Sequence, residues 1–234
     1  MKLENYVNAM KEKINHYNSV PVNTLKVCVT AGNEKIGKVL NVSLPPVFTC
    51  PNCSGCKHEC YDKDDCRYKN VLDARARNYS IMTRDIDGYF TQIQDAVAKH
   101  PSFTFFRFHV GGDIPFSNGD AYFSRMVQFA KNNPSLTIWT YTKNYWTVNR
   151  YVKENGGSIK AAIPENLSVM FSQWRGIPME NPYGFAEFQA YYDDETIPDN
   201  VMVCPGNCRI CEEKKIGCPY RQTVCTRIRK QGNR

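Results

Sequence analysis

Hydrophobic residues recur along the chain at two spacings, one typical of helices and one typical of strands. Residues 3–17 are amphipathic, which predicts an N-terminal helix within residues 1–18. Residues 118–133 predict a further amphipathic helix, with Pro134 just beyond its end. The apolar face of this helix is formed by Tyr122, Met126, Phe129 and Ala130. Between these two helices, the pattern predicts a strand over 25–33 and a helix over 71–100 that is broken near residues 85–88.

Strand-like and helical runs alternate from residue 103 onward. β-branched and aromatic residues predict strands over 103–110, 136–143 and 167–174, with helices over 118–133 and 144–155 between them. This alternation indicates βαβ units and a parallel sheet. We therefore predict an α/β fold, a single domain over the whole chain with a partial (βα) barrel-like sheet and cysteine-rich loops at the barrel mouth.

Polar and aromatic residues cluster where three of these predicted strands end. In barrels of this kind, functional residues gather at the carboxyl ends of the strands, so we expect a ligand pocket there. The pocket candidates are His109, Asp113 and Lys143 as catalytic residues, and Arg107, Gly111, Gly112, Trp139, Tyr141 and Trp174 as ligand-binding residues. Taken singly, Arg107 or His109 also fits a satisfied core position, and Gly111–Gly112 also fit a turn before the next helix.

Six of these candidates have an expected role in binding a small molecule. The Asp113 carboxylate would hold an ammonium or hydroxyl group, and Arg107 and Lys143 would hold a carboxylate or phosphate. The imidazole of His109 would donate a proton or form a hydrogen bond close to the cluster. The two glycines would let the backbone approach the ligand closely, because they carry no Cβ.

Ten of the eleven cysteines lie in two segments, 45–66 and 204–225. The N-terminal cysteine group (Cys50, Cys53, Cys56 and Cys60) has the C-x2-C-x2-C-x3-C spacing of bacterial [4Fe–4S] ferredoxins, with Tyr61 in place of the usual proline. The C-terminal cysteine group (Cys204, Cys208, Cys211 and Cys218) begins with C-x3-C-x2-C, and Cys218 is the candidate fourth ligand. We predict both groups as metal ligands. Cys28 is predicted to be a small buried hydrophobic residue.

Three kinds of cysteine site compete. The first residues form no apolar signal region and no stretch is long enough to cross a membrane, which predicts a cytoplasmic protein with reduced thiols and disfavours disulfides. A structural zinc site would use four of the ten clustered cysteines, for example Cys53 and Cys56 with Cys208 and Cys211. Two four-iron clusters would use eight. The count favours one or two [4Fe–4S] clusters, with zinc as the alternative.

The net charge of +7 is concentrated near the C-terminus. Residues 205–234 hold eight Lys and Arg and two Glu, so they contribute +6. A basic tail over 226–234 fits a nucleic-acid contact, compensation for anionic thiolate clusters, or a solvated tail. Two alternatives to a redox enzyme therefore stay open: a zinc-stabilised nucleic-acid-binding protein, and an iron–sulfur electron carrier or redox sensor. The expected partner is a small-molecule ligand or an electron donor.

Four stretches resemble a known family. TCPNCSGCKHECY, RFHVGGD, WTYTKN and VCPGNCRIC occur here in the same order as in the phage-encoded, cysteine-rich family described as gene product 88. The resemblance runs from about Val42 to Cys218. The family pattern corresponds to Cys50, Cys56 and Cys60–Tyr61, and it implies no particular activity.

A looser resemblance is to radical S-adenosylmethionine enzymes. These enzymes are similar in having partial βα barrels, a cysteine triad in an early loop, and a GGE motif that contacts the methionine amine. The stretch Gly111–Asp113 is similar to that motif. The C-x3-C-x2-C triad departs from the family because it occurs at Cys204–Cys211, after the predicted strands. This resemblance implies S-adenosylmethionine as a ligand beside an iron–sulfur cluster.

Overall fold

The computed structural model describes residues 1–32, 36–51 and 53–228. Its helices are α1 (Leu3–Asn18), α2 (Tyr61–Asp65), α3 (Lys69–Arg84), α4 (Ile86–Ala98), α5 (Gly119–Asn132), α6 (Tyr145–Glu154), α7 (Ile159–Ala162) and α8 (Cys208–Lys214), with short 3₁₀ turns at Val22–Thr24, Cys53–Gly55 and Cys218–Tyr220. Its strands are β1 (Val29–Thr30), β2 (Val39–Val42), β3 (Phe105–Phe108), β4 (Thr137–Thr142), β5 (Leu167–Gln173), β6 (Glu187–Tyr191), β7 (Met202–Val203) and β8 (Val224–Arg227).

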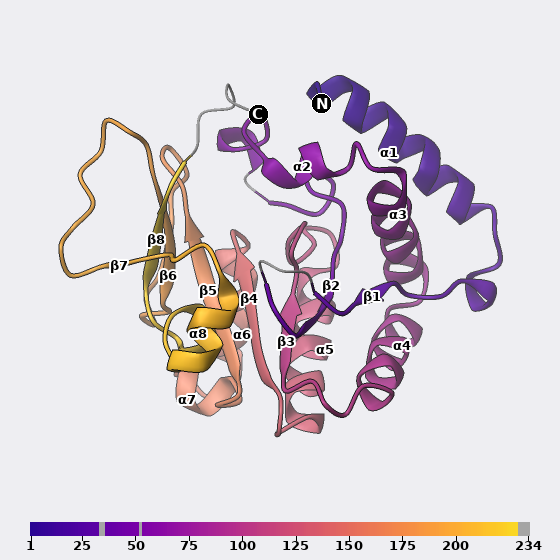
Figure 1. Cartoon of the computed structure of the whole chain (residues 1–234). Coiled ribbons are helices and arrows are strands. Elements are labelled where there is room, and N and C mark those ends of the chain that lie inside the picture. Colours follow the sequence, from indigo (N-terminus) through magenta and orange to yellow (C-terminus); the bar gives the residue numbers. More distant parts are fainter. Residues whose placement is uncertain (33–35, 52, 229–234) are drawn as a thin grey trace.

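The eight strands form one sheet in the order β1-β2-β3-β4-β5-β6-β8-β7 (Figure 1). Every neighbouring pair is parallel except β1 with β2, which are antiparallel. The predicted α/β class and parallel pairing are confirmed. The described strands do not close into a barrel, because β1 and β7 lie at opposite edges of the sheet.

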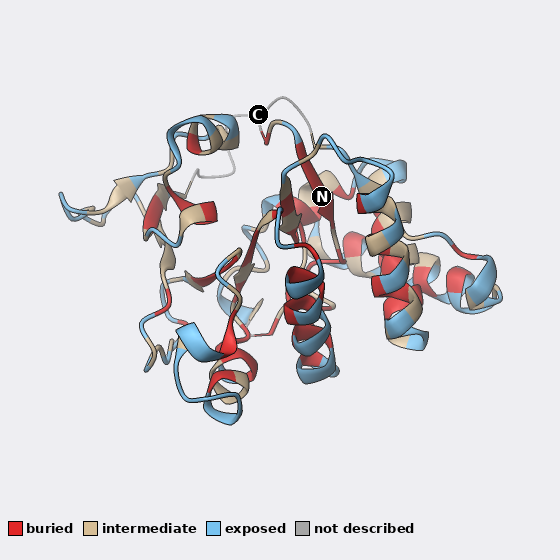
Figure 2. Ribbon diagram, turned by 90° about the horizontal axis from the view of Figure 1, so that it is seen from below, coloured by how far each residue is buried: buried red, intermediate tan, exposed pale blue. Residues whose placement is uncertain are grey.

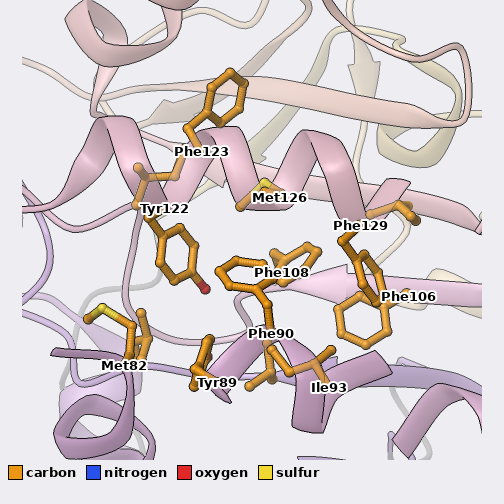
Figure 3. Packing of buried hydrophobic residues seen from close by; sticks show 14 of the residues in the cluster. Met82, Tyr89, Phe90, Ile93, Phe106, Phe108, Tyr122, Phe123, Met126 and Phe129 are labelled. Carbon is orange, nitrogen blue, oxygen red and sulfur yellow. The ribbon is translucent and has the colours of Figure 1, made fainter. Parts of the chain in front are cut away.

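The main core lies between the sheet and its helices. Alternate residues of β3, Phe106 and Phe108, point to the helix side, where they meet α4 and α5 (Figure 3). Phe106 packs against Phe129 with ring centroids 5.0 Å apart, and Phe108 packs against Phe90 at 6.0 Å. The helices turn buried faces to the core and exposed faces to solvent (Figure 2). Helix α1 packs on α3.

A second, smaller core covers the other face of the sheet. It contains Val39, Trp139 and Met170 from three strands, together with Cys218 and Val224. The segment that follows β7 supplies this cover, since the turn at Cys218–Tyr220 contacts β4 and β5. Residues 204–225, the C-terminal cysteine segment, therefore pack directly on the sheet.

Most of the elements predicted from the hydrophobic pattern are present. The helix over 3–17 and the strands in 103–174 are confirmed, and the expected helix break falls at Asp85, whose Oδ1 accepts a hydrogen bond from Gly88 N at 2.8 Å. The strand predicted over 25–33 was wrong for most of its length. Among the described residues 25–32, only Val29–Thr30 form a strand, and the backbone N–H of Cys28 donates to the Asn78 side chain at 2.7 Å. Cys28 is half-buried, not buried as predicted.

Candidate metal centre on the sheet face

The C-terminal cysteine group surrounds one cavity. Its four thiols line a space of about 20 Å³ against the sheet, together with Trp139, Tyr141, Pro205, Asn207, Pro219 and Val224. All eleven cysteines of the chain lie in the described residues, and none of them forms a disulfide. Four thiols from a stretch of only fifteen residues, Cys204 to Cys218, are thus brought to one place.

Local geometry fixes the positions of these thiols. Asn207 accepts a hydrogen bond from Arg209 N at 3.0 Å and so caps α8, which places Cys208 and Cys211 about one turn apart. Gly217 has φ +75°, and a Cβ there would lie 3.2 Å from the Cys211 sulfur. The hydroxyl of Ser168, buried in β5, donates to the carbonyl of Cys218 at 2.6 Å. The sheet therefore holds the last thiol of the group in place.

The sheet side of the cavity is lined by aromatic residues of β4. Trp139 and Tyr141 are two residues apart and point to the same face of the strand. Trp139 is fully buried, and its indole Nε1 has no hydrogen-bond partner among the described residues. The Arg107 guanidinium lies over the Tyr141 ring, 4.7 Å from its centroid. The indole N–H of Trp139, the hydroxyl of Tyr141 and the guanidinium of Arg107 therefore lie close to the four cysteines.

The electrostatics of this region connect the same groups. Burial raises the pKa of the Cys218 thiol to about 12, although a hydrogen bond with Tyr141 lowers it. Burial also raises the pKa of Cys211 to about 11. Burial lowers the pKa of Arg107, but the nearby Tyr141, Tyr61, Cys208 and Cys218 outweigh this and raise it. Without a bound cation, Cys211 and Cys218 are protonated at pH 7, so a metal would have to displace their protons.

The N-terminal cysteine group lies near the carboxyl ends of β3 and β4. Burial raises the pKa of Cys50, and the negative charges of Asp113 and Cys60 add to this effect. Burial raises the pKa of Cys56 as well. The Lys143 ammonium acts against this effect at both thiols, but both pKa values stay above the ordinary value. At this edge of the sheet, the Lys143 ammonium therefore acts on both Cys50 and Cys56, and Cys60 acts on Cys50.

Cys66, the other cysteine of this segment, has a different environment. It is buried and accepts a hydrogen bond from Arg75 Nη1 at 3.0 Å. Arg75 also forms a buried ion pair with Asp62. Cys66 is therefore part of the packing between α2 and α3.

The paired glycines after β3 accommodate protein groups. A Cβ at Gly111 would lie 1.9 Å from Asp62 Oδ2, so the missing side chain makes room for that carboxylate. Gly112 has φ +84°, and a Cβ there would lie 2.5 Å from the Leu44 carbonyl oxygen. The same turn is tied to β2 by a hydrogen bond from Leu44 N to Gly111 O at 3.0 Å. These contacts account for both glycines without a ligand.

The Asp113 carboxylate is also occupied inside the protein. Its Oδ1 accepts hydrogen bonds from Ile114 N and Thr142 Oγ1, both at 2.6 Å, and its Oδ2 accepts from Lys143 N at 2.8 Å. Burial raises its pKa to about 6, against the effect of these hydrogen bonds. Asp113 joins the end of β3 to the end of β4, and this arrangement gives no support to the expected ammonium or hydroxyl contact.

His109 packs against helix α5 on the helix side of the sheet. Its Nε2 is 2.7 Å from the Tyr122 hydroxyl of α5, and the side chain is buried. Burial and the Arg107 charge lower its pKa to about 3. A histidine with this pKa is neutral at pH 7, so the geometry does not support the expected proton-donor role.

The remaining pocket candidates form a group at the end of β5. Lys143 Nζ donates to Ser172 Oγ at 3.1 Å and lies 5.5 Å from the Trp174 ring centroid. The Trp174 indole donates to the Tyr192 hydroxyl at 3.1 Å. Of the nine predicted pocket residues, only Trp139 and Tyr141 line the sheet-face cavity, and Arg107 lies beside it.

Three residues around the cavity were not found from the sequence. Ser168 is one small polar residue inside an apolar strand, so no pattern distinguishes it. Asn207 and Gly217 stand next to predicted ligands and carry the ordinary signals of a helix cap and a left-handed turn. Those two signals were available in the sequence and were not used.

Comparison with known proteins identifies a family. A family model described as gene product 88 matches residues 11–176, more than half of the chain. The chain belongs to this family. The gene product 88 match contains the N-terminal cysteine group and strands β2 to β5, and it ends before the C-terminal cysteine group. No curated protein and no solved structure gives a match, so the looser resemblance to radical S-adenosylmethionine enzymes gains no support.

Two further observations concern metal sites and membrane-spanning helices. Within the described ranges, no three His, Cys, Asp or Glu side chains are arranged as a site for a metal ion. Across the same residues, no helix combines the length and the apolar character needed to cross a bilayer. Most of the predicted basic tail, residues 229–234, lies outside the described residues, whereas Thr226 and Arg227 belong to β8.

Proposed function

We propose that this member of the gene product 88 family is an iron–sulfur protein that transfers electrons. The C-terminal cysteine group would hold one [4Fe–4S] cluster and the N-terminal cysteine group a second. The observation that carries the proposal is the cavity at the sheet face, which four thiols border together with a buried indole N–H that has no partner in the described residues. A polar group buried in this way calls for an acceptor, and cluster sulfur is one.

The number of clustered cysteines favours two clusters over one zinc ion, which would use only four of the ten. A cubane is bound through four separate iron atoms, so its cysteines stand around it without converging on one point. All four cysteines of the C-terminal cysteine group line the cavity. Four protein thiolates leave no iron open to a substrate, which fits electron transfer better than catalysis at the cluster.

Zinc is the second candidate because of the size of the cavity. A space of about 20 Å³ has room for about one water molecule. A space of this size suits one zinc ion better than a cubane. A zinc-stabilised protein would then use its basic C-terminal residues on nucleic acid.

The protein would contribute position and environment, and the cluster, when bound, would supply one-electron redox chemistry. Trp139 and Met170 exclude water from the sheet side of the cavity, since both are fully buried. Arg107 supplies positive charge near Cys208 and Cys218. The expected partner is a one-electron donor in a reducing, cytoplasmic environment.

S-adenosylmethionine is not part of this proposal. The glycine turn that would admit it is filled by Asp62 and Leu44, and Asp113 is bonded to neighbouring backbone and side-chain groups.

Metal analysis after anaerobic purification tests the proposal. We expect about eight iron and eight sulfide ions per chain, the content of two four-iron clusters. Cys211→Ala and Cys60→Ala should each lose about half of the iron, because each removes a ligand of one cluster. Cys28→Ala, which changes a cysteine outside both groups, should keep all of it. Stoichiometric zinc with negligible sulfide would exclude the iron–sulfur proposal and favour the zinc protein.

A further inference from the structure

Strand register brings three different polar groups to one wall of the sheet-face cavity. Arg107 of β3 is paired directly with Trp139 of β4, and Tyr141 follows two residues later on the same face. On the next strand, Ser168 is paired with Trp139 and holds the Cys218 backbone. The wall and the ligand segment are thus fixed to the same strands.

The indole of Trp139 is the member of this wall that needs an explanation. Trp is a hydrogen-bond donor only, and a buried donor without an acceptor costs about 1–3 kcal/mol. Trp139 has no exposed surface, lines the cavity with the four thiols, and has no acceptor for Nε1 among the described residues. A large apolar side chain would fill the same space without that cost. The donor is explained if the cavity holds an acceptor when loaded.

Tyr141 and Arg107 point to the same occupant. The Tyr141 hydroxyl acts on the Cys218 thiol and lowers its pKa against the effect of burial, and Ser168 holds the backbone carbonyl of the same cysteine. The Arg107 guanidinium stacks on the Tyr141 ring, and its only hydrogen bond within the described residues runs from Nε to the His109 carbonyl at 3.2 Å. The Asp62 carboxylate forms its ion pair with Arg75, although the Arg107 charge also acts on it, against the burial that raises its pKa. The positive charge of Arg107 acts on Cys208 and Cys218 as well.

We propose that Trp139, Tyr141 and Arg107 form a donor wall that stabilises the reduced state of the cluster held by the C-terminal cysteine group. Trp139 and Tyr141 donate hydrogen bonds to its sulfur atoms, and Arg107 supplies a nearby positive charge. The donor wall raises the reduction potential of this cluster above the value that four thiolates alone would give. This inference rests on the proposed function.

The direction follows from charge. Reduction adds one electron to a group that already carries negative charge from its thiolates, so hydrogen-bond donors and a cation stabilise the reduced state more than the oxidised state. The four cysteines bind the cluster in either state, and loss of one donor leaves the ligand set complete. The donor wall therefore affects the potential more than it affects the iron content.

A redox titration measures this effect directly. The anaerobically purified protein is reduced stepwise with dithionite in the presence of mediators, and each cluster is followed by its EPR signal. Trp139→Phe and Tyr141→Phe remove one donor each and keep an aromatic ring. We expect each to lower the reduction equilibrium constant of one cluster about tenfold, or about 59 mV for a one-electron couple. The other cluster serves as an internal reference and should keep its potential.

Charge is tested separately from hydrogen bonding. Arg107→Met should lower the potential of the same cluster, and Arg107→Lys should restore most of the difference because it returns a positive charge. Trp146→Phe changes an exposed tryptophan of α6 and is the matched control for Trp139→Phe. It should leave both potentials unchanged.

The possible results distinguish the two proposals. An iron-loaded wild type in which Trp139→Phe, Tyr141→Phe and Arg107→Met all keep the wild-type potentials would overturn the donor wall alone. A wild type with zinc and no sulfide would overturn the proposed function, and the donor wall with it. If Trp139→Phe fails to retain iron, the Tyr141→Phe and Arg107→Lys variants decide the question by the same titration.

Discussion

At the scale of single residues, His109 has the most unusual environment. It is buried between the end of β3 and α5, with Arg107 on its own segment and Tyr122 of α5 as its neighbours. Its Nδ1 has no hydrogen-bond partner within the described residues. Burying a neutral imidazole in this way makes the folded protein resist protonation of a group that the unfolded chain protonates easily.

This environment predicts a pH-dependent loss of stability. The pKa of His109 is about 3 in the folded protein, and the ordinary value is 6.5. The contribution to stability is complete above pH 6.5 and decreases as the pH falls from 6.5 towards 3, because only the unfolded chain gains the proton. Between pH 7.5 and 5.5, the wild type should lose about 1.4 kcal/mol more unfolding free energy than His109→Gln.

Urea denaturation at the two pH values measures this difference. His100→Gln, which replaces an exposed histidine, should keep the wild-type slope. Equal slopes for the wild type and His109→Gln would contradict the expected pKa. The Tyr122 side chain does not titrate in this range, since burial raises its pKa well above its usual value.

The glycines after β3 show how far a residue pattern can be interpreted. A glycine pair before an aspartate at a strand end fits a ligand turn and a tight protein turn equally well. What decides between them is the identity of the neighbours, Asp62 and the Leu44 carbonyl, which come from distant parts of the chain. No local pattern contains that information. The need for glycine was predictable, and the group that it accommodates was not.

At the scale of secondary structure elements, the predictions succeeded where one strand or helix has a long periodic pattern. Strands β3 to β5 and helices α1, α5 and α6 were found because each has an apolar face several residues long. The short strands β2, β7 and β8 have two to four residues and depend on pairing with distant strands. The open sheet likewise depends on which strands lie at its edges, and the βαβ pattern does not specify this.

Strand β5 carries the prediction that belongs to this scale. Ser168→Ala removes the hydrogen bond from β5 to the Cys218 carbonyl, so it should lower the unfolding free energy by about 1 kcal/mol and increase amide exchange in residues 204–218. Thr140→Val is the matched control. Thr140 is buried on the opposite face of β4, and its hydroxyl has no partner among the described residues.

The two substitutions should change the unfolding free energy by different amounts or in opposite directions. Replacing an unpaired buried hydroxyl by a methyl group of similar shape is neutral or stabilising. Hydrogen exchange by mass spectrometry, together with denaturation, checks both variants. An unchanged exchange rate in 204–218 for Ser168→Ala would show that the C-terminal cysteine segment is held to the sheet by other contacts.

At the scale of the whole molecule, Arg107 stands between the two cysteine groups. On one side, Tyr61 follows Cys60 directly and its hydroxyl donates to the Val110 carbonyl at 2.7 Å. On the other side lie Tyr141 and the C-terminal cysteine group. Tyr61 and the two thiols Cys208 and Cys218 all raise the Arg107 pKa. The two groups are therefore linked through one residue of the central sheet, although about 140 residues separate Cys60 from Cys204 in the sequence.

This link predicts that metal in either group stabilises the entire fold. The ligands of each group are anchored to the same central strands, so the free energy of metal binding adds to the unfolding free energy of the sheet. Cys56→Ala and Cys208→Ala should each lower the Tm of the anaerobically purified protein, with Cys28→Ala as a control that keeps the wild-type Tm.

After chelation and removal of the metal, the Tm values of the three variants and the wild type should lie close together, because an unligated thiol contributes little beyond its packing. Calorimetry of loaded and metal-free samples measures this difference. If Cys208→Ala loses metal while the Tm of the loaded protein stays unchanged, the C-terminal cysteine segment unfolds independently of the sheet, and the metal then stabilises only its own loop.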